Sequence, residues 1–427
     1  MNKLTYDAIQ ETIYEKKLDN GLQVFLLPKH EVSKTYGIFM TNYGSTDRTF
    51  TPIQEKENIS VPDGVAHFLE HKLFEKEDRD VFSDFLKQGA SPNAYTSFTK
   101  TAYLFSATKM VEKNVETLLD FVQDPFFSDE SVEKEKGIIG QEIKMYDDQP
   151  DWQSFMGTIK NMFKNHPVNI DIAGTVSSIS TITKEDLYTC YNTFYHPKNM
   201  VLFVIGNFNP DTMMATIEEN QGQKNFPVLD GINRDIPDEP ESVAVKENVI
   251  HLPVSIPKVT VGIKESNRHL TKDEFLKHET IQSMLLDYFF SSSGPFYEEL
   301  YEANLIDDSF EYSTTVEKDF SFSLISSNTE KPEAFANRVK QLLLSTNNLN
   351  LNDDTLSVMK KKRIGQLLRS MNSLEFIANQ YVNYYFAGID FFNLTSYIQE
   401  LSLEDINDFL KKWIDDDRLT VCKIESE

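Results

Sequence analysis

Two stretches of the chain follow one pattern: Ile179-Ser180-Thr181-Ile182-Thr183-Lys184-Glu185-Asp186-Leu187 and Ile398-Gln399-Glu400-Leu401-Ser402-Leu403-Glu404-Asp405-Ile406. In each, apolar residues precede a Ser or Thr, and a Glu-Asp pair follows. This order is typical of a capped helix start. An amphipathic helix and an apolar strand are predicted next, the strands at 200–205 and 419–424. The recurrence indicates a duplicated unit, with chance similarity of α+β fragments as the alternative.

The elements around these two stretches recur in the same order. The first half predicts strands at 23–27 and 35–42, then a helix with Asp63 as its N-cap, paired strands, and a long helix from Ser128. The second half also predicts strands and long helices, and its Ile364-Gly365-Gln366-Leu367 faces Ile139-Gly140-Gln141-Glu142. We therefore expect an α+β fold of two related domains, each a mainly antiparallel sheet packed with helices. The expected divisions are a first domain at 1–220, a proline-rich acidic linker at 221–248 and a second domain at 249–427.

Composition limits the classes of partner. The chain has 427 residues, of which 40% are hydrophobic, which is enough for a large packed core. It carries 42 basic and 67 acidic residues, for a net charge of −25. Nucleic acid is a poor partner, because a phosphate backbone requires a basic face. The one basic run, 360–363, is interpreted as a solvated helix face.

The cysteine content and the hydropathy of the sequence bear on the cellular compartment of the protein. The two cysteines, Cys190 and Cys422, lie in apolar segments and fit buried free thiols better than a disulfide framework. The N-terminal residues lack the basic-then-apolar pattern of a signal peptide. No run of about 18 apolar residues is present, so no transmembrane helix and no membrane partner are expected. A cytoplasmic protein is therefore predicted.

The sharpest chemical signal is His67-Phe68-Leu69-Glu70-His71. On a helix, residues four apart share a face, so His67 and His71 can bind one metal ion through two imidazoles. Glu70 borders the same face, where a carboxylate can take a proton from water at the metal. The alternative is two ordinary surface or capping histidines. The apolar flanking residues favour the metal site, because polar groups in such surroundings cost free energy unless they bind a partner.

A catalytic zinc usually has three protein ligands, so a third must come from elsewhere in the chain. The long helix from Ser128 offers Glu135 and Glu142, seven residues apart on one face. They lie about 10 Å apart along the helix axis, so one ion cannot take both directly. The duplication places Lys360 and Leu367 at the equivalent positions, and the second half has no H-x-x-E-H. Both glutamates are thus candidates for metal chemistry.

These motifs together resemble the pitrilysin-type inverzincin metallopeptidases, which include insulin-degrading enzyme and the mitochondrial processing peptidase. The resemblance is greatest to bacterial single-unit members. It rests on H-x-x-E-H, on the two glutamates, and on further blocks that match the family. These blocks are Gly89-Ala90-Ser91-Pro92-Asn93-Ala94-Tyr95-Thr96, His166-Pro167 with Gly174-Thr175, and Tyr195-His196-Pro197-Lys198-Asn199-Met200.

The resemblance implies a role for each of these residues. It makes His67, His71 and Glu142 the ligands of one Zn²⁺ per chain and Glu70 the catalytic base. Glu135 becomes a supporting residue next to the ligands. The resemblance also makes 93–96, that is Asn93, Ala94, Tyr95 and Thr96, the edge strand on which a peptide substrate lies. The implied activity is that of a zinc-dependent endopeptidase subunit acting on peptides or small unfolded polypeptides.

One departure from the family bears on partners. Complete active members carry an Arg and a Tyr seven apart that hold the substrate carbonyl, and their place falls in 294–308. The alignment puts Tyr301 and Asp308 there. An acidic side chain opposes a developing oxyanion, so a homologous partner subunit that supplies the missing pair is expected, as a heterodimer. A homodimer is the alternative.

Two other functions fit the same residues. One is a non-catalytic structural or assembly protein of this fold, and measured zinc content separates it from the peptidase. The other is a zinc hydrolase of small amides. Cleavage of long peptides but not of short amides distinguishes the peptidase from this second alternative.

Overall fold

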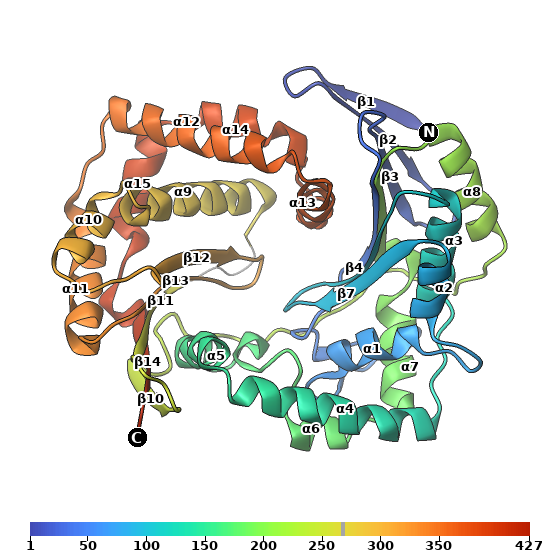
Figure 1. Cartoon of the computed structure of the whole chain (residues 1–427), viewed down its shortest axis with the longest axis horizontal. Coiled ribbons are helices and arrows are strands. Elements are labelled where there is room, and N and C mark those ends of the chain that lie inside the picture. Colours follow the sequence, from blue (N-terminus) through green and yellow to red (C-terminus); the bar gives the residue numbers. More distant parts are fainter. Residues whose placement is uncertain (266–269) are drawn as a thin grey trace. The chain divides into compact units, whose positions relative to one another are not determined.

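Contacts along the chain divide the protein into two compact units (Figure 1). The structure is a computed structural model that describes residues 1–265 and 270–427. The first unit comprises Met1–Ile143, Ile170–Ile236 and Ser370–Phe386, and the second comprises Lys144–Asn169, Pro237–Arg369 and Ala387–Glu427. The expected domains followed sequence order, whereas contacts place two segments, 144–169 and 370–386, in the unit built mostly from the other half of the chain.

The first unit is built on a seven-stranded sheet with the order β1-β2-β3-β9-β4-β8-β7. The pairing between β3 and β9 is parallel and the other pairings are antiparallel. The central strands β4 and β9 are buried along their whole length, which explains their almost unbroken apolar sequence. The strands, with the separate β5–β6 ribbon, are β1 (Asn2–Tyr6), β2 (Glu11–Lys17), β3 (Gln23–Pro28), β4 (Thr35–Thr41), β5 (Thr49–Phe50), β6 (Ile59–Ser60), β7 (Ala90–Thr96), β8 (Thr101–Ala107) and β9 (Met200–Gly206).

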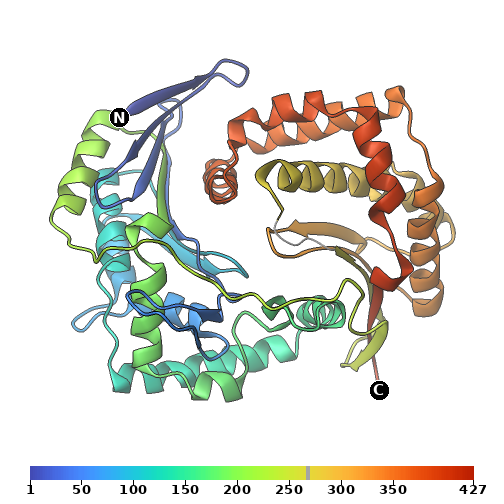
Figure 2. The ribbon, with the colours of Figure 1, turned by 180° about the vertical axis from the view of Figure 1, so that it is seen from behind.

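Helices cover this sheet, as Figure 2 shows from behind. Phe68, Leu118 and Leu187 come from three of these helices, are fully buried, and share a core with Leu202 of β9. Burial of such side chains contributes about 1.5–3 kcal/mol each. The helices are α1 (Val65–Phe74), α2 (Val81–Lys87), α3 (Val111–Val122), α4 (Asp129–Asp147), α6 (Val176–Ser180), α7 (Lys184–Phe194) and α8 (Pro210–Gly222), with 3-10 turns at Pro167–Asn169 and Pro197–Asn199.

The second unit repeats the pairing pattern of the first. Its sheet has the order β10-β14-β11-β13-β12, with β10 and β14 parallel and the rest antiparallel, like β3-β9-β4-β8-β7. The α+β fold of two related domains is therefore confirmed. The strands are β10 (Glu247–His251), β11 (Lys258–Glu265), β12 (Glu311–Val316), β13 (Ser321–Asn328) and β14 (Leu419–Glu425).

Helix α15 (Leu403–Trp413) of the second unit begins where the sequence predicts, directly after Ser402. Ser402 and Asp405 form a capping box at the start of α15, as Thr183 and Asp186 do at the start of α7. The two similar stretches are thus the same local structure in two copies. The helices are α9 (Lys272–Phe290), α10 (Pro295–Glu302), α11 (Pro332–Ser345), α12 (Asp353–Ser370), α14 (Leu394–Glu400) and α15 (Leu403–Trp413), with 3-10 turns at Thr346–Asn348, Phe391–Asn393 and Asp416–Arg418.

Each sheet is also covered by a helix from the other half of the sequence. Helix α5 (Pro150–Met162) packs on β11 and β14, where the hydroxyls of Ser154 and Thr260 lie 2.7 Å apart. Helix α13 (Leu374–Phe386) packs on β4 and β9, and the ring of Tyr381 lies 4.8 Å from that of Phe25. The exchange is reciprocal, because α5 follows α4 and α13 follows the equivalent helix α12.

This exchange predicts that neither half of the chain folds alone. Fragments 1–236 and 237–427, expressed separately, are each expected to lack a cooperative unfolding transition, because each leaves one sheet face without its helix. Mixed or co-expressed, they are expected to form a complex with the far-ultraviolet circular dichroism of the whole chain. Calorimetry of each fragment and of the mixture checks this. A cooperative transition in either fragment alone would contradict the prediction.

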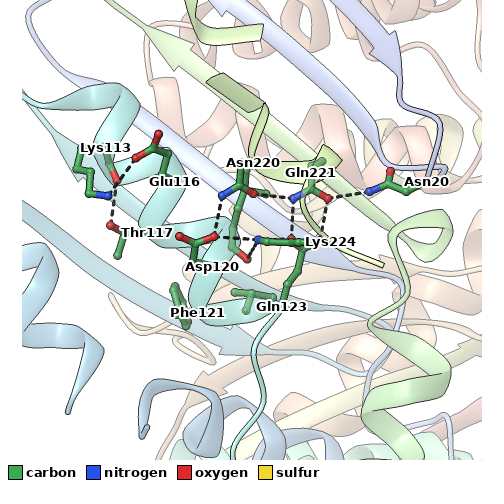
Figure 3. A network of polar contacts seen from close by, with 12 residues as sticks. Asn20, Lys113, Glu116, Thr117, Asp120, Phe121, Gln123, Asn220, Gln221 and Lys224 are labelled. Atoms are coloured by element: carbon green, nitrogen blue, oxygen red, sulfur yellow. Dashed lines mark hydrogen bonds and ion pairs between the residues drawn. The ribbon is translucent and has the colours of Figure 1, made fainter. Parts of the chain in front are cut away.

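The segment between the halves begins in a polar network at the ends of α3 and α8 (Figure 3). Gln221 donates to Gln123 at 2.7 Å and accepts from Asn20 at 2.9 Å. Lys224 forms an ion pair with Asp120 at 2.9 Å. These contacts hold the start of the 221–248 segment on the first unit.

Two further features concern hydropathy and thiols. Cys190 and Cys422 are free and buried, as expected. Within the described ranges 1–265 and 270–427, no helix combines the length and hydropathy needed to cross a bilayer.

Candidate metal centre

Helix α1 presents the two histidines of the motif from a buried position. Its N-cap is Gly64, with φ 93°, and not Asp63 as the sequence predicts. A Cβ at Gly64 would lie 2.4 Å from the carbonyl oxygen of Ala173, so the close approach requires glycine. Asp63 instead forms an ion pair with Arg48 at 2.9 Å.

The structure brings His67, His71 and Glu142 together, with one ligand atom of each within 4.8 Å of the others. The Nε2 atoms of His67 and His71 lie 3.8 and 3.5 Å from the two carboxylate oxygens of Glu142, which reaches them from α4. The imidazole centroids are 4.6 Å apart. Two imidazoles and one carboxylate are a donor set that suits Zn²⁺ and leaves a fourth position open.

His67 has the electrostatics of a neutral ligand. Burial, together with the neighbouring His71, lowers its pKa to about 3. Its Nδ1 atom is buried and has no hydrogen-bond partner in the part of the chain that the structure describes. A neutral imidazole offers a lone pair to a cation, so the residue fits a metal site.

His71 is held from behind by Glu135, the other glutamate of α4. Its Nδ1 lies 3.0 Å from Glu135 Oε1. Burial lowers the pKa of His71, but this hydrogen bond and the surrounding carboxylates outweigh burial and raise it overall. If Nδ1 carries the proton, Glu135 fixes the tautomer in which Nε2 turns toward Glu142. The two glutamates therefore occupy different places, Glu142 among the ligand atoms and Glu135 behind one of them.

Lys72 is a charged residue of this region that the motif analysis did not single out. Its side chain is fully buried, forms an ion pair with Glu75 and lies 3.9 Å from Glu135. A buried ammonium among carboxylates balances their charge. The available signal was a lysine set in the apolar run of α1.

Glu70 lies beside the three grouped ligand residues and is not one of them. Its carboxylate accepts a hydrogen bond from the Thr96 hydroxyl at 2.6 Å. Burial raises the pKa of Glu70 above its ordinary value, against the lowering effect of Thr96 and His71. A carboxyl group whose proton affinity is raised next to a metal site suits proton transfer better than ligation.

The predicted substrate strand, 93–96, lies in β7 at one edge of the first sheet. At the hairpin turn the Ser97 amide donates to the Lys100 carbonyl, which makes 97 and 100 a hydrogen-bonded pair. Because such pairs alternate along an antiparallel ladder, residues 91, 93 and 95 bond to β8. The backbone groups of Pro92, Ala94 and Thr96 therefore face the open edge.

The remaining predicted residues of this strand have other contacts. The Tyr95 hydroxyl donates to Asn379 of α13 at 2.6 Å, and the Asn93 side chain accepts from the Ala94 amide at 2.9 Å. Asn379 comes from the far end of the chain, and no sequence signal indicated it.

Other motif residues are structural. His166 and His196, each followed by proline, accept a hydrogen bond on Nδ1 from the amide two residues later, at 3.1 Å in both cases. The Tyr301 ring stacks on Tyr297 and is exposed, and Asp308 is also exposed.

Comparison with known proteins gives consistent matches. A profile described as "Insulinase (Peptidase family M16)" matches residues 53–176, and one described as "Peptidase M16 inactive domain" matches residues 181–362. A Bacillus subtilis (strain 168) protein named "Uncharacterized zinc protease YmfH" is 49% identical over 99% of this chain and 98% of its own length.

Solved structures agree with the sequence matches. A protein from Alicyclobacillus acidocaldarius whose crystal structure is titled "putative M16-like peptidase" has a TM-score of 0.94 and 38% identity, over 98% of this chain and 99% of that one. The periplasmic protease PqqL of Escherichia coli shares the fold, with a TM-score of 0.74 and 17% identity, over 100% of this chain but 48% of PqqL. With these matches, and with the H-x-x-E-H helix set against Glu142, the chain belongs to the M16 (insulinase) family of peptidases.

Proposed function

We propose that the protein is a zinc-dependent endopeptidase subunit. The observation that carries the proposal is the convergence of His67, His71 and Glu142 on one point, with Glu70 beside them and outside the ligand set. The name of the Bacillus subtilis relative, a zinc protease, supports the same activity. The proposed compartment is the cytoplasm, which the two free buried thiols favour.

Each side chain has a proposed part. His67, His71 and Glu142 hold Zn²⁺, with Glu135 orienting His71 through its Nδ1. A bound zinc supplies Lewis acidity, which polarises a carbonyl and makes water more acidic. Glu70 accepts the proton of the attacking water on its carboxylate and returns it to the amine that leaves.

The substrate is proposed to be a peptide that adds as a strand to the open edge of β7. Ala94 and Thr96 offer backbone groups in the direction that an added strand needs, and Thr96 also contacts Glu70. Recognition through backbone groups selects extended, unfolded segments over folded proteins. It also explains why short amides, which cannot extend along the edge, are expected to be poor substrates.

Cleavage of a long fluorescence-quenched peptide tests the proposal. We expect zinc-dependent hydrolysis of an unstructured peptide, loss of hydrolysis in a chelator, and recovery when zinc is returned. Short amide substrates serve as the comparison. Cleavage of short amides in preference to the long peptide would favour a small-amide hydrolase instead.

A non-catalytic assembly role is the other candidate. The observation in its favour is that residues 181–362 match a profile described as an inactive domain. That range excludes His67 and Glu142. The match therefore concerns the part of the chain that does not contain the proposed zinc ligands. Absence of bound zinc in the whole protein would favour this role.

We further propose that a partner subunit completes the active enzyme. The fold match covers 48% of PqqL, so that protein is about twice the length of this fold. The positions expected to hold the substrate carbonyl are Tyr301 and Asp308, and a carboxylate there would repel a developing oxyanion. A homologous chain bringing Arg and Tyr would replace that repulsion by hydrogen-bond donation.

The partner proposal predicts low activity for the chain alone. Adding a homologous partner from the same source is expected to raise kcat/KM by about two to three orders of magnitude, the contribution of an oxyanion donor. Steady-state peptidase assays with and without the partner measure this. Full activity of the single chain, unchanged by any partner, would exclude the heterodimer.

A further inference from the structure

The open edge of β7 has few backbone donors. Pro92 has no N–H, and the Ala94 amide already donates to the Asn93 side chain at 2.9 Å. Thr96 is the next residue whose backbone faces the edge. Within 92–96, a peptide carbonyl that accepts a hydrogen bond from this edge must therefore displace the Asn93 side chain at Ala94 or bond to the Thr96 amide, and bonding at Thr96 requires no such displacement.

The same residue fixes the candidate base. The Thr96 hydroxyl donates a hydrogen bond to Glu70 Oε2 at 2.6 Å. Among the described residues, no other group donates a hydrogen bond to this carboxylate. A glutamate has three side-chain torsions, so one strong hydrogen bond decides where its carboxylate rests. Backbone docking and placement of the base thus meet in a single residue.

We propose that Thr96 is a positioning residue that couples peptide docking on β7 to the orientation of Glu70. This inference rests on the proposed peptidase function. A strand that bonds to the Thr96 backbone holds β7 still, and the Thr96 hydroxyl then holds Glu70 at a fixed distance from the docked peptide. A carboxylate misplaced by about 1 Å can cost about a hundredfold in rate, so such coupling has a measurable effect.

Substitutions at two facing positions separate this role from a structural one. Thr96→Val keeps the β-branched shape and the backbone but removes the hydroxyl, and Thr96→Ser keeps the hydroxyl. Thr101 lies directly opposite Thr96 in the register, is fully buried, and donates to the Tyr43 carbonyl at 2.9 Å. Thr101→Val is therefore a matched control that removes a hydroxyl from the same hairpin without touching Glu70.

The kinetic test uses the full chain, with its partner if activity requires one. We expect Thr96→Val to lower kcat about 10- to 100-fold, with KM for the peptide and zinc content unchanged. Thr96→Ser is expected to restore most of kcat, and Thr101→Val to change stability and not kcat. An unchanged kcat in Thr96→Val, or an equal fall in Thr101→Val, would overturn the inference.

Crystal structures of the wild type and of both valine variants give a readout that needs no activity. The Glu70 carboxylate is expected to lie within hydrogen-bond distance of residue 96 in the wild type and in Thr101→Val, and to move in Thr96→Val. An unmoved Glu70 in Thr96→Val would overturn the inference. If the wild type cleaves no peptide under any condition, the proposed function fails, and the crystal structures still decide the role of Thr96.

Discussion

Replacing Glu70 by Gln is expected to lower kcat for peptide cleavage by about two to four orders of magnitude while the protein keeps its zinc. The amide has nearly the same shape and can still accept a hydrogen bond from Thr96, but it cannot take a proton from water. Steady-state kinetics and metal analysis on the same preparation measure both effects. The loss should fall on kcat, because substrate binding on β7 does not involve the Glu70 proton.

The matched control for this variant is Glu77→Gln, an exposed glutamate just beyond α1. It removes one negative charge from the same region and is expected to leave kcat and zinc content unchanged. Loss of zinc from Glu70→Gln would contradict the assignment, because it would make Glu70 a ligand instead of a base.

The second large effect is expected on metal affinity at α4. Glu142→Gln should weaken zinc binding by more than about 100-fold, because a neutral amide replaces the anionic member of the ligand set. Glu135→Gln should weaken it by about 10- to 100-fold, the usual cost of losing a group that orients a ligand histidine. Competition with a chelator of known affinity ranks the two variants.

Glu133 provides the control on the same helix. It is exposed and pairs with Lys136, away from the histidines, so Glu133→Gln is expected to leave zinc affinity unchanged. A larger loss of zinc affinity in Glu135→Gln than in Glu142→Gln would contradict the assignment, because it would make Glu135 the third ligand.

Much of the fold could be predicted because it is encoded locally. The capping boxes at Thr183 and Ser402 and the apolar strands that follow are short-range signals, and their recurrence indicated the duplication. The exchange of α5 and α13 could not be predicted in this way. Which sheet an amphipathic helix covers depends on side chains far away in sequence, such as Phe25 for Tyr381.

The candidate site likewise has one part that follows from local sequence and another that depends on residues far apart in the chain. His67, Glu70 and His71 lie within one helical turn and a half, so their shared surroundings follow from helix geometry. The duplication made both Glu142 and Glu135 candidates, and the family resemblance was needed to tell them apart. Thr96 was predicted as a substrate contact, but its hydrogen bond to Glu70 depends on how β7 packs against α1, and Asn379 reaches β7 only through the exchanged helix α13.

The most direct test of the account is the zinc content of the purified full-length protein. Elemental analysis is predicted to find about one zinc per chain in the wild type and none in a His67→Ala/His71→Ala variant with the same circular dichroism. Wild-type protein with its native fold and no bound transition metal, after purification without chelator and incubation with zinc, would contradict the central claim.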